Sequence, residues 1–310
     1  MPKAISLFTG GGGSDVGLHT AGFEVVFAND VLPYARDFYL RNLPETDFVV
    51  QDIGQIDVFP DADLLVGCYP CQGFSQGGAR KAGRKVNYLY REFDRALRQI
   101  RPKAFIVENV PGMRRSDLNH LLQNQVTRFR LAGYRVRWKI LNSEEYGVSQ
   151  QRRRLFIVGL RSDLGMTYAF PDPTHGATGR PFVTIRDSIS HLPLWPEGEY
   201  NTERFHWYYL SRNRYRDWDS ISKTVVAKGR HVPLHPVSPK LLRVHTDKWV
   251  FEHAGPARRF SFRECAILQG FSRHVEFPDT ASMNEKYKVV GNAVPPPLFE
   301  AVVRAIPAVW

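Results

Sequence analysis

Cysteine is scarce in this chain, which has only Cys68, Cys71 and Cys265 among its 310 residues. Three cysteines are too few for a framework of disulfide bridges, so we expect a reducing compartment. No run of about eighteen apolar residues occurs, which argues against a membrane-spanning helix. The opening residues, MPKAISLF, lack the apolar stretch and cleavage site of a signal peptide. Together these absences predict a cytoplasmic protein.

Acidic residues are outnumbered by basic ones, 31 against 42, and the formal net charge is +11. Such an excess favours a polyanionic partner, and nucleic acid before a membrane. A basic enzyme without such a partner stays open on charge alone. The length suits one large domain or two modest ones with a buried core.

Short apolar runs alternate with amphipathic segments in the first half of the chain. We predict strands over Ala4–Phe8, Glu24–Ala28, Phe48–Val50, Leu64–Gly67, Phe105–Val107, Arg135–Ile140 and Leu155–Gly159. We predict helices over Ser14–Thr20, Tyr34–Arg41, Phe93–Ile100 and Leu118–Leu131. This alternation predicts an α/β fold with a parallel, doubly wound sheet, which binds ligands at the carboxyl ends of its strands.

The composition changes near Phe170. From Pro171 to about Pro256 the chain is rich in Pro, Trp, Tyr, Arg and His, with weak periodicity, which predicts a loop-rich second domain. A helix is predicted over Ser261–Gly270, and a closing helix over Val294–Ile306. We therefore expect one domain over 1–170, completed by 285–310, and a smaller one over 171–284.

A glycine-rich turn, Leu7–Ser14, lies between the first strand and the first helix. Glycines there permit a tight turn and close approach to NAD, FAD or S-adenosylmethionine, although a plain turn would look the same. Asp30 and Asp52 follow the next two strands, where they would bind a ribose and an adenine or simply form turns.

The apolar strand Leu64–Gly67 runs into Pro70-Cys71-Gln72, which places Cys71 at the ligand-binding edge of the sheet. Cys68 and Cys71 form a C-x-x-C pair, so zinc and redox functions must be weighed. Zinc needs about four ligands, and the sequence has no second cysteine pair. His206, His231, His235 and His245 of the second domain lack metal-ligand spacing with nearby cysteines or acids, so no metal is predicted. Cys68 is expected to fall within the strand and to belong to the core.

Glu108 ends another apolar strand and reaches the same edge. Burying a carboxylate is costly unless it is paired or functional. Before the last strand, Arg152 and Arg154 would point the same way in an extended chain, although a solvated basic run is the ordinary alternative.

Five segments in this order resemble the motif set of the DNA (cytosine-5)-methyltransferases: Phe8–Gly13, Pro70–Gln72, Glu108–Val110, Gln150–Arg154 and Gly291–Val294. Arg259–Glu264 with Leu268–Phe271 resembles the segment that follows target recognition in this family. The resemblance implies a Rossmann-like methyltransferase domain, a target-recognition domain over the unmatched region, and the modification enzyme of a restriction-modification system.

The chemistry needs a nucleophile, because carbon 5 of cytosine is itself a poor one. A Cys71 thiolate adding to carbon 6 would activate carbon 5. A free thiol has a pKa of about 8.5, so Arg152 or Arg154 nearby would raise the thiolate fraction. Protonated Glu108 would donate to N3. The residue that removes the carbon 5 proton is not identified by the sequence.

The resemblance assigns further roles. Arg154 would hold O2 of the cytosine, and Asn109 would orient the loop that carries Pro70. S-adenosylmethionine is the implied cofactor and S-adenosylhomocysteine the product. The implied cofactor contacts are Phe8, Gly10, Gly12, Gly13, Asp30, Asp52, Ile53, Leu89, Asn292 and Ala293.

Double-stranded DNA is the implied substrate, and the target base must leave the helix to react. Segment 73–90 is expected to form a mobile loop over that base. The predicted DNA contacts are Gln72, Ser75, Arg80, Lys81, Arg84, Lys85 and Arg230. Many family members carry Asp-x-Arg where this chain has Arg84 and Val86, so loop contacts are expected to differ. A monomer is expected, with any partner endonuclease acting without direct contact.

Three alternatives compete with this prediction. The transfer-RNA-methylating branch shares the motifs, but its Cys-Phe-Thr signature is absent here. An inactive DNA-binding regulator would not need Cys71, Glu108 and Arg154. A nicotinamide-dependent oxidoreductase on a similar sheet would not explain Pro-Cys-Gln together with Glu-Asn-Val.

Overall fold

The computed structural model describes residues 1–70, 88–114, 119–177, 179–246 and 248–310, and these form two compact units. The sheet unit consists of Met1–Asn142, Arg153–Asp172 and Phe299–Trp310. The loop-rich unit consists of Ser143–Arg152 and Pro173–Leu298. These units divide the chain at other residues than the expected domains, because 143–152 and 285–298 both fall in the loop-rich unit.

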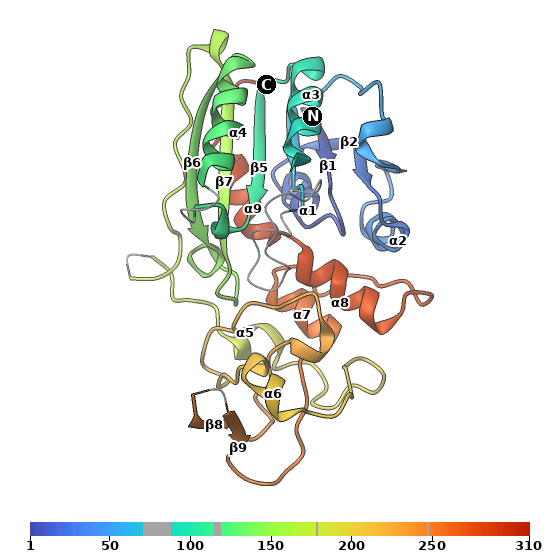
Figure 1. Cartoon of the computed structure of the whole chain (residues 1–310), viewed down its shortest axis with the longest axis vertical. Helices are drawn as coiled ribbons and strands as arrows, with labels where there is room; N and C mark the ends of the chain where they lie inside the picture. Colours follow the sequence, from blue (N-terminus) through green and yellow to red (C-terminus); the bar gives the residue numbers. More distant parts are fainter. Residues whose placement is uncertain (71–87, 115–118, 178, 247) are drawn as a thin grey trace. The chain divides into compact units, whose positions relative to one another are not determined.

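All seven predicted strands are present and form one sheet in the sheet unit (Figure 1). They are β1 (Lys3–Leu7), β2 (Glu24–Asp30), β3 (Asp47–Val50), β4 (Leu64–Gly67), β5 (Ala104–Asn109), β6 (Tyr134–Asn142) and β7 (Arg153–Arg161), in the order β3-β2-β1-β4-β5-β7-β6. Strand order reverses between β1 and β4, so the loops after these strands diverge and leave room for a ligand.

The expectation of parallel strands throughout is wrong for β7, which runs antiparallel to both β5 and β6. Parallel neighbours need a crossover connection, usually a helix. Between β6 and β7 the chain makes only the 3-10 turn η4 (Ser143–Tyr146) and a short loop. The direction of the last strand is therefore set by its connection and not by the apolar pattern of the strand.

Helices cover both faces of this sheet (Figure 1). They are α1 (Gly13–Thr20), α2 (Pro33–Asn42), α3 (Tyr90–Ile100), α4 (Asn119–Leu131) and α9 (Pro296–Arg304). Side chains alternate along a strand, and β7 shows the result. Leu155 and Ile157 join the core that contains Phe93 of α3 and Phe129 of α4, whereas Phe156 meets Phe299 of α9 at 6.2 Å between ring centroids.

The loop-rich unit has short elements, as the weak periodicity of its sequence predicts. They are α5 (Ile185–Ile189), α6 (Trp207–Leu210), the hairpin of β8 (Leu241–His245) and β9 (Lys248–Phe251), α7 (Phe262–Leu268) and α8 (Met283–Asn292). The predicted helix over 261–270 is α7. The C-terminal helix expected within 285–310 is divided into α8 and α9, and the start of α8 was not predicted. Ser282 and Glu285 form a capping box at the start of α8, and this S-x-x-E pattern was a usable signal.

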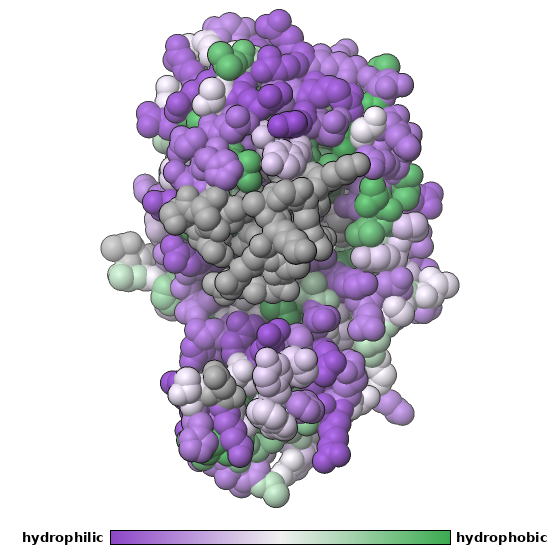
Figure 2. All heavy atoms as spheres, in the orientation of Figure 1, coloured by the Kyte–Doolittle hydropathy of each residue, from purple (hydrophilic) through white to green (hydrophobic). Residues whose placement is uncertain are grey.

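Hydrophilic side chains dominate the face of the molecule drawn in Figure 2. Across the described part of the chain, no helix has both the length and the apolar character needed to cross a membrane.

Candidate active site and nucleic-acid surface

The glycine-rich turn follows β1 and is shaped by residues in the left-handed region of backbone space. Phe8, Gly10 and Gly12 have φ angles of 58°, 54° and 75°. A side chain at Gly12 would place its Cβ 2.6 Å from the ring of Tyr39, so only glycine fits there. No atom lies within 4 Å of the corresponding position at Gly10. The turn is therefore packed on one side and open on the other.

Phe8 adopts its positive φ although it is not glycine, a conformation that the surrounding structure must stabilise. Its ring packs edge-on against Tyr69, with the centroids 5.9 Å apart. Leu89 precedes α3 and packs half-buried against the same core, and Ile53 is fully buried there. Two loops at the carboxyl edge of the sheet are thus packed together through Phe8 and Tyr69.

Asp30 connects the end of β2 to the glycine-rich turn. Its carboxylate accepts the amide hydrogens of Gly10 at 2.9 Å and Leu32 at 3.1 Å. Burial raises the pKa of Asp30, against the effect of these hydrogen bonds. A carboxylate has about four acceptor positions, and the amides of Gly10, Leu32 and Val31 use three, so one remains for a hydroxyl group. Val31, which follows, is 57% exposed and offers an apolar surface that the sequence analysis did not single out.

Asp52 caps η1 (Ile53–Gln55) by accepting the amide hydrogen of Gly54 at 2.9 Å. Both acids predicted to contact a nucleoside are therefore also turn-forming residues, the alternative that the sequence had left open. The two roles are compatible, because the turn uses only part of each carboxylate's acceptor capacity.

Asp15 was missed by the sequence analysis, although it organises the start of α1. It is completely buried and accepts hydrogen bonds from the hydroxyl groups of Ser6, Thr9 and Ser14. Burial raises the pKa of this carboxyl, and the three hydroxyl donors oppose that shift. An acid in the first turn of a helix that follows a glycine-rich turn is the signal that would have found it.

Glu108 and Arg154 meet on the antiparallel pair β5 and β7. Arg154 Nε lies 2.7 Å from Glu108 Oε1, and the two side chains are 13% and 11% exposed. Burial lowers the pKa of Arg154, while the Glu108 carboxylate raises it. The structure thus brings together two residues that the sequence separates by 46 positions and that were both predicted to act on the base.

Asn109, the next residue, fixes the loop after β4. Its side-chain amide donates to the carbonyl oxygen of Tyr69 at 3.4 Å, directly before Pro70, and its oxygen accepts the amide hydrogen of Val110. The hydroxyl of Tyr69 donates to Gln125 of α4 at 2.6 Å. This geometry supports the role implied for Asn109, and it adds Tyr69 and Gln125, which the sequence gave no reason to choose.

Cys68 lies at the same edge and is a free thiol. Burial raises its pKa well above the ordinary range, and Glu108 and Asp15 add to the shift. Its Sγ lies 3.8 Å from the hydroxyl of Ser14. A thiol held in its neutral form is a poor nucleophile, which supports a packing role for Cys68.

Several predicted residues fall outside the described part of the chain. They are Cys71, Gln72, Ser75, Arg80, Lys81, Arg84 and Lys85, together with Val86. Their assignments stay predictions from the sequence.

Arg152 has different surroundings from those expected. It is 2% exposed, and its guanidinium donates to the carbonyl oxygens of Val225, Gly291 and Ala293 at 2.9–3.0 Å. It therefore acts within the loop-rich unit as a link between distant backbone segments, whereas Arg154 is paired in the sheet unit. The sequence named both arginines as catalytic candidates, and these contacts commit the Arg152 guanidinium to backbone carbonyl groups.

Gln150 also connects the backbone near Val225 with the segment that contains Ala293. Its oxygen accepts the amide hydrogen of Val225 at 2.8 Å, and its nitrogen donates to Gln269 at 2.5 Å. Gln269 in turn donates to the carbonyl oxygen of Ala293. Gly291 leaves no room for a Cβ against Val226 and Ala227. The motif Gln-x-Arg therefore positions the motif Gly-Asn-x-Val, in which Asn292 stays exposed.

We expect Arg152→Met to lower the free energy of unfolding by about 3 kcal/mol, because three buried carbonyl groups lose a charged donor. Chemical denaturation monitored by circular dichroism would measure the change. Arg153→Met is the matched control, since the Arg153 side chain is exposed. Equal stability of the two variants would contradict a linking role for Arg152.

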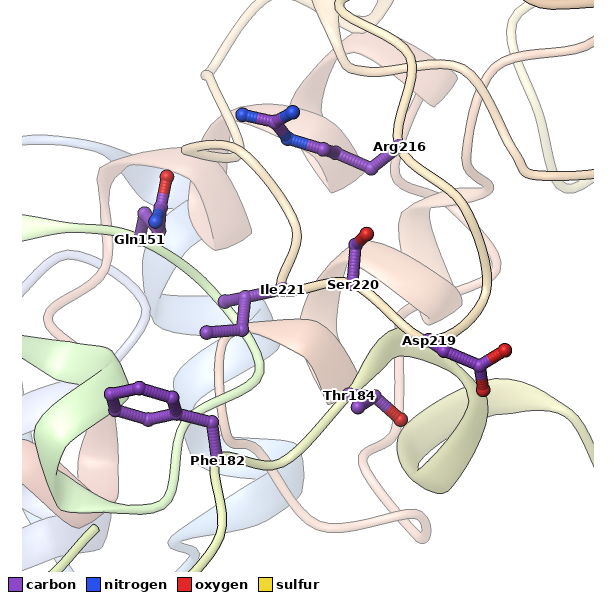
Figure 3. Close-up of a pocket in the computed structure, with 7 residues that line it drawn as sticks. All are labelled: Gln151, Phe182, Thr184, Arg216, Asp219, Ser220 and Ile221. Atoms are coloured by element: carbon purple, nitrogen blue, oxygen red, sulfur yellow. The ribbon is translucent and has the colours of Figure 1, made fainter. Parts of the chain in front are cut away.

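The loop-rich unit also carries an open pocket of about 420 Å³ (Figure 3). Its lining residues are Gln151, Phe182, Thr184, Arg216, Asp219, Ser220 and Ile221. None of the site residues predicted from the sequence is among them. Arg230, the predicted DNA contact in this unit, lies over the ring of Tyr209 instead, at 4.8 Å from the centroid.

The similarity of this chain to known proteins extends over nearly its whole length. Residues 2–308 match the family described as C-5 cytosine-specific DNA methylase. The chain is 37% identical to the Type II methyltransferase M.BsuRI of Bacillus subtilis, over 98% of this chain and 79% of that protein. It is 36% identical to the Type II methyltransferase M.MthTI of Methanothermobacter thermautotrophicus, over 97% and 96%.

Solved structures match the fold. Spodoptera frugiperda DNMT2, solved as a mutant, gives a TM-score of 0.71 at 17% identity, covering 98% of this chain and 99% of that one. The Entamoeba histolytica methyltransferase EhMeth gives a TM-score of 0.71 at 15% identity, covering 98% and 97%.

Proposed function

Because this chain belongs to the C-5 cytosine-specific DNA methylase family and methylates carbon 5 of cytosine in DNA, we propose that Cys71, Glu108 and Arg154 carry out the reaction. The observation that carries the proposal is the mostly buried pair of Arg154 and Glu108, 2.7 Å apart at the edge of the sheet. A guanidinium and a carboxyl group side by side match the O2 and N3 positions of one cytosine ring.

Each residue has a defined step in the proposed mechanism. The sulfur of Cys71 bonds to carbon 6, and Glu108 protonates N3 while Arg154 donates to O2, so that carbon 5 becomes nucleophilic. After carbon 5 has gained the methyl group, its proton leaves to solvent, the bond from sulfur to carbon 6 breaks, and N3 returns its proton to Glu108. The thiolate of Cys71 is thereby restored.

We propose S-adenosylmethionine as the methyl donor, and the carboxyl edge of the sheet fits this molecule. The open side of Gly10 leaves space for the methionine part, Asp30 retains acceptor capacity for a ribose hydroxyl, and Val31 offers an apolar surface to the adenine. The other proposed contacts are Phe8, Gly12, Gly13, Asp52, Ile53, Leu89, Asn292 and Ala293. When bound, this cofactor supplies an electrophilic methyl group.

We further propose double-stranded DNA as the substrate of a monomeric, cytoplasmic enzyme. The names of the relatives, Type II methyltransferases, favour the modification half of a restriction-modification system. In this proposal the endonuclease acts on the same DNA without touching this chain.

A covalent trapping experiment tests the proposed chemistry. The protein is incubated with S-adenosylmethionine and mixed-sequence duplex DNA that contains 5-fluorocytosine. Fluorine cannot leave as a proton does, so the enzyme should stay bound through Cys71 in an adduct that survives denaturation. No adduct on DNA, with methyl transfer to transfer RNA instead, would overturn the assignment of the substrate.

A further inference from the structure

Two large aromatic side chains of the loop-rich unit are exposed next to one another. Trp207 and Tyr208 of α6 are 58% and 57% exposed, and their rings contact edge-on at 5.8 Å. Over α6, the drawn face of this unit carries spheres of intermediate hydropathy among hydrophilic ones (Figure 2). Neighbouring exposed aromatic rings on a folded protein indicate a binding surface more often than a lone apolar residue does.

The backbone beneath these rings is firmly held. Leu210, two residues later, is buried, and the ring of His206 accepts the amide hydrogen of Tyr208 at 3.3 Å. The His206 ring also stacks on Trp207, with an interplanar angle of 28°. The exposure of Trp207 and Tyr208 is therefore imposed by the fold of α6 and does not come from a loose segment.

Positive charge lies next to this pair, over the ring of Tyr209, whose centroid is 5.0 Å from that of Tyr208. The guanidinium groups of Arg230 and Arg212 lie 4.8 and 5.6 Å from the centroid of the Tyr209 ring. Asn213 donates to the carbonyl oxygens of Arg230 and Val232, which ties the two segments together. Glu203 is 3.7 Å from Arg230 and compensates part of this charge. Aromatic rings framed by arginines complement the bases and phosphates of DNA.

We propose that Trp207 and Tyr208 form an aromatic wedge that stacks on the bases of the substrate DNA, while Arg212 and Arg230 contact the neighbouring backbone. The proposal rests on the proposed function, which makes DNA the substrate. Inserting a ring into a base step unstacks that step, and the stacking contact offsets part of the cost. An enzyme that must extract a base benefits from such a distortion of the duplex.

Removing both rings tests the wedge. The double variant Trp207→Ala/Tyr208→Ala is expected to bind duplex DNA about 10- to 100-fold more weakly, as measured by fluorescence anisotropy. The slope of affinity against salt concentration should stay as in the wild type, because no phosphate contact is removed. Trp207→Phe/Tyr208→Phe keeps both rings and should bind within about threefold of the wild type.

Two further measurements separate the outcomes. Wild type and the phenylalanine variant should change the fluorescence of 2-aminopurine placed at the wedged step of the duplex, and the alanine variant should not. Trp310→Ala, which removes a 40% exposed tryptophan of the sheet unit, should bind DNA normally. If the double alanine variant binds DNA as tightly as the wild type, the wedge proposal is wrong. It is also wrong if sedimentation shows that the wild type dimerises through this surface. A wild type that forms no 5-fluorocytosine adduct would refute the proposed function instead.

Discussion

Cys71→Ala is expected to reduce methyl transfer by at least about 10⁴-fold while DNA binding is retained. Without the sulfur, carbon 6 has no nucleophile, and carbon 5 stays too electron-poor to take up the methyl group. Transfer of labelled methyl groups to duplex DNA measures the loss, and gel-shift titration measures binding. The same substitution should abolish the adduct with 5-fluorocytosine DNA.

Cys68→Ala is the matched control, because Cys68 is a second thiol three residues away whose pKa is raised by burial. It should retain adduct formation, with a stability loss of about 1 kcal/mol from the missing sulfur. Methylation that persists in Cys71→Ala and disappears in Cys68→Ala would transfer the role of nucleophile to Cys68.

Glu108→Gln is expected to lower kcat by about 10²- to 10⁴-fold, the range for loss of a general acid. The amide keeps the shape of the side chain and can still accept from Arg154, but its N–H hydrogens are too weakly acidic to be transferred to N3. Single-turnover methylation measures the chemical step, and circular dichroism checks the fold. A kcat near the wild-type value would exclude Glu108 as the proton donor.

Arg154→Ala tests what the pair of Arg154 and Glu108 contributes to the stability of the fold, apart from the kcat effect of Glu108→Gln. It leaves the Glu108 carboxylate without the guanidinium at 2.7 Å in a mostly buried place, which is expected to cost about 3–5 kcal/mol. The double variant Arg154→Ala/Glu108→Gln should recover part of that loss, because no uncompensated charge remains. Strict additivity of the two changes in unfolding free energy would show that the pair does not interact.

The sequence by itself determined the elements of the sheet and the order of the motifs. Each strand of the sheet was predicted from the sequence, most of them as short apolar runs, and the glycine-rich turn, Glu108 and Asn109 were found where the strands end. These features are local, since periodicity and turn chemistry act within a few neighbouring residues. The family resemblance was visible for the same reason, as short motifs in a fixed order.

Only the tertiary structure decided the direction of β7 and the task of Arg152. Strand direction depends on the connection and on the neighbour that the strand finds, here β5, which is far away in the sequence. Arg152 is held by carbonyl groups of residues 225, 291 and 293, and no local pattern announces partners that the fold brings from such distances. The exposure of Trp207 and Tyr208 also could not be predicted, because the sequence shows an aromatic residue but not whether the folded chain exposes it to solvent.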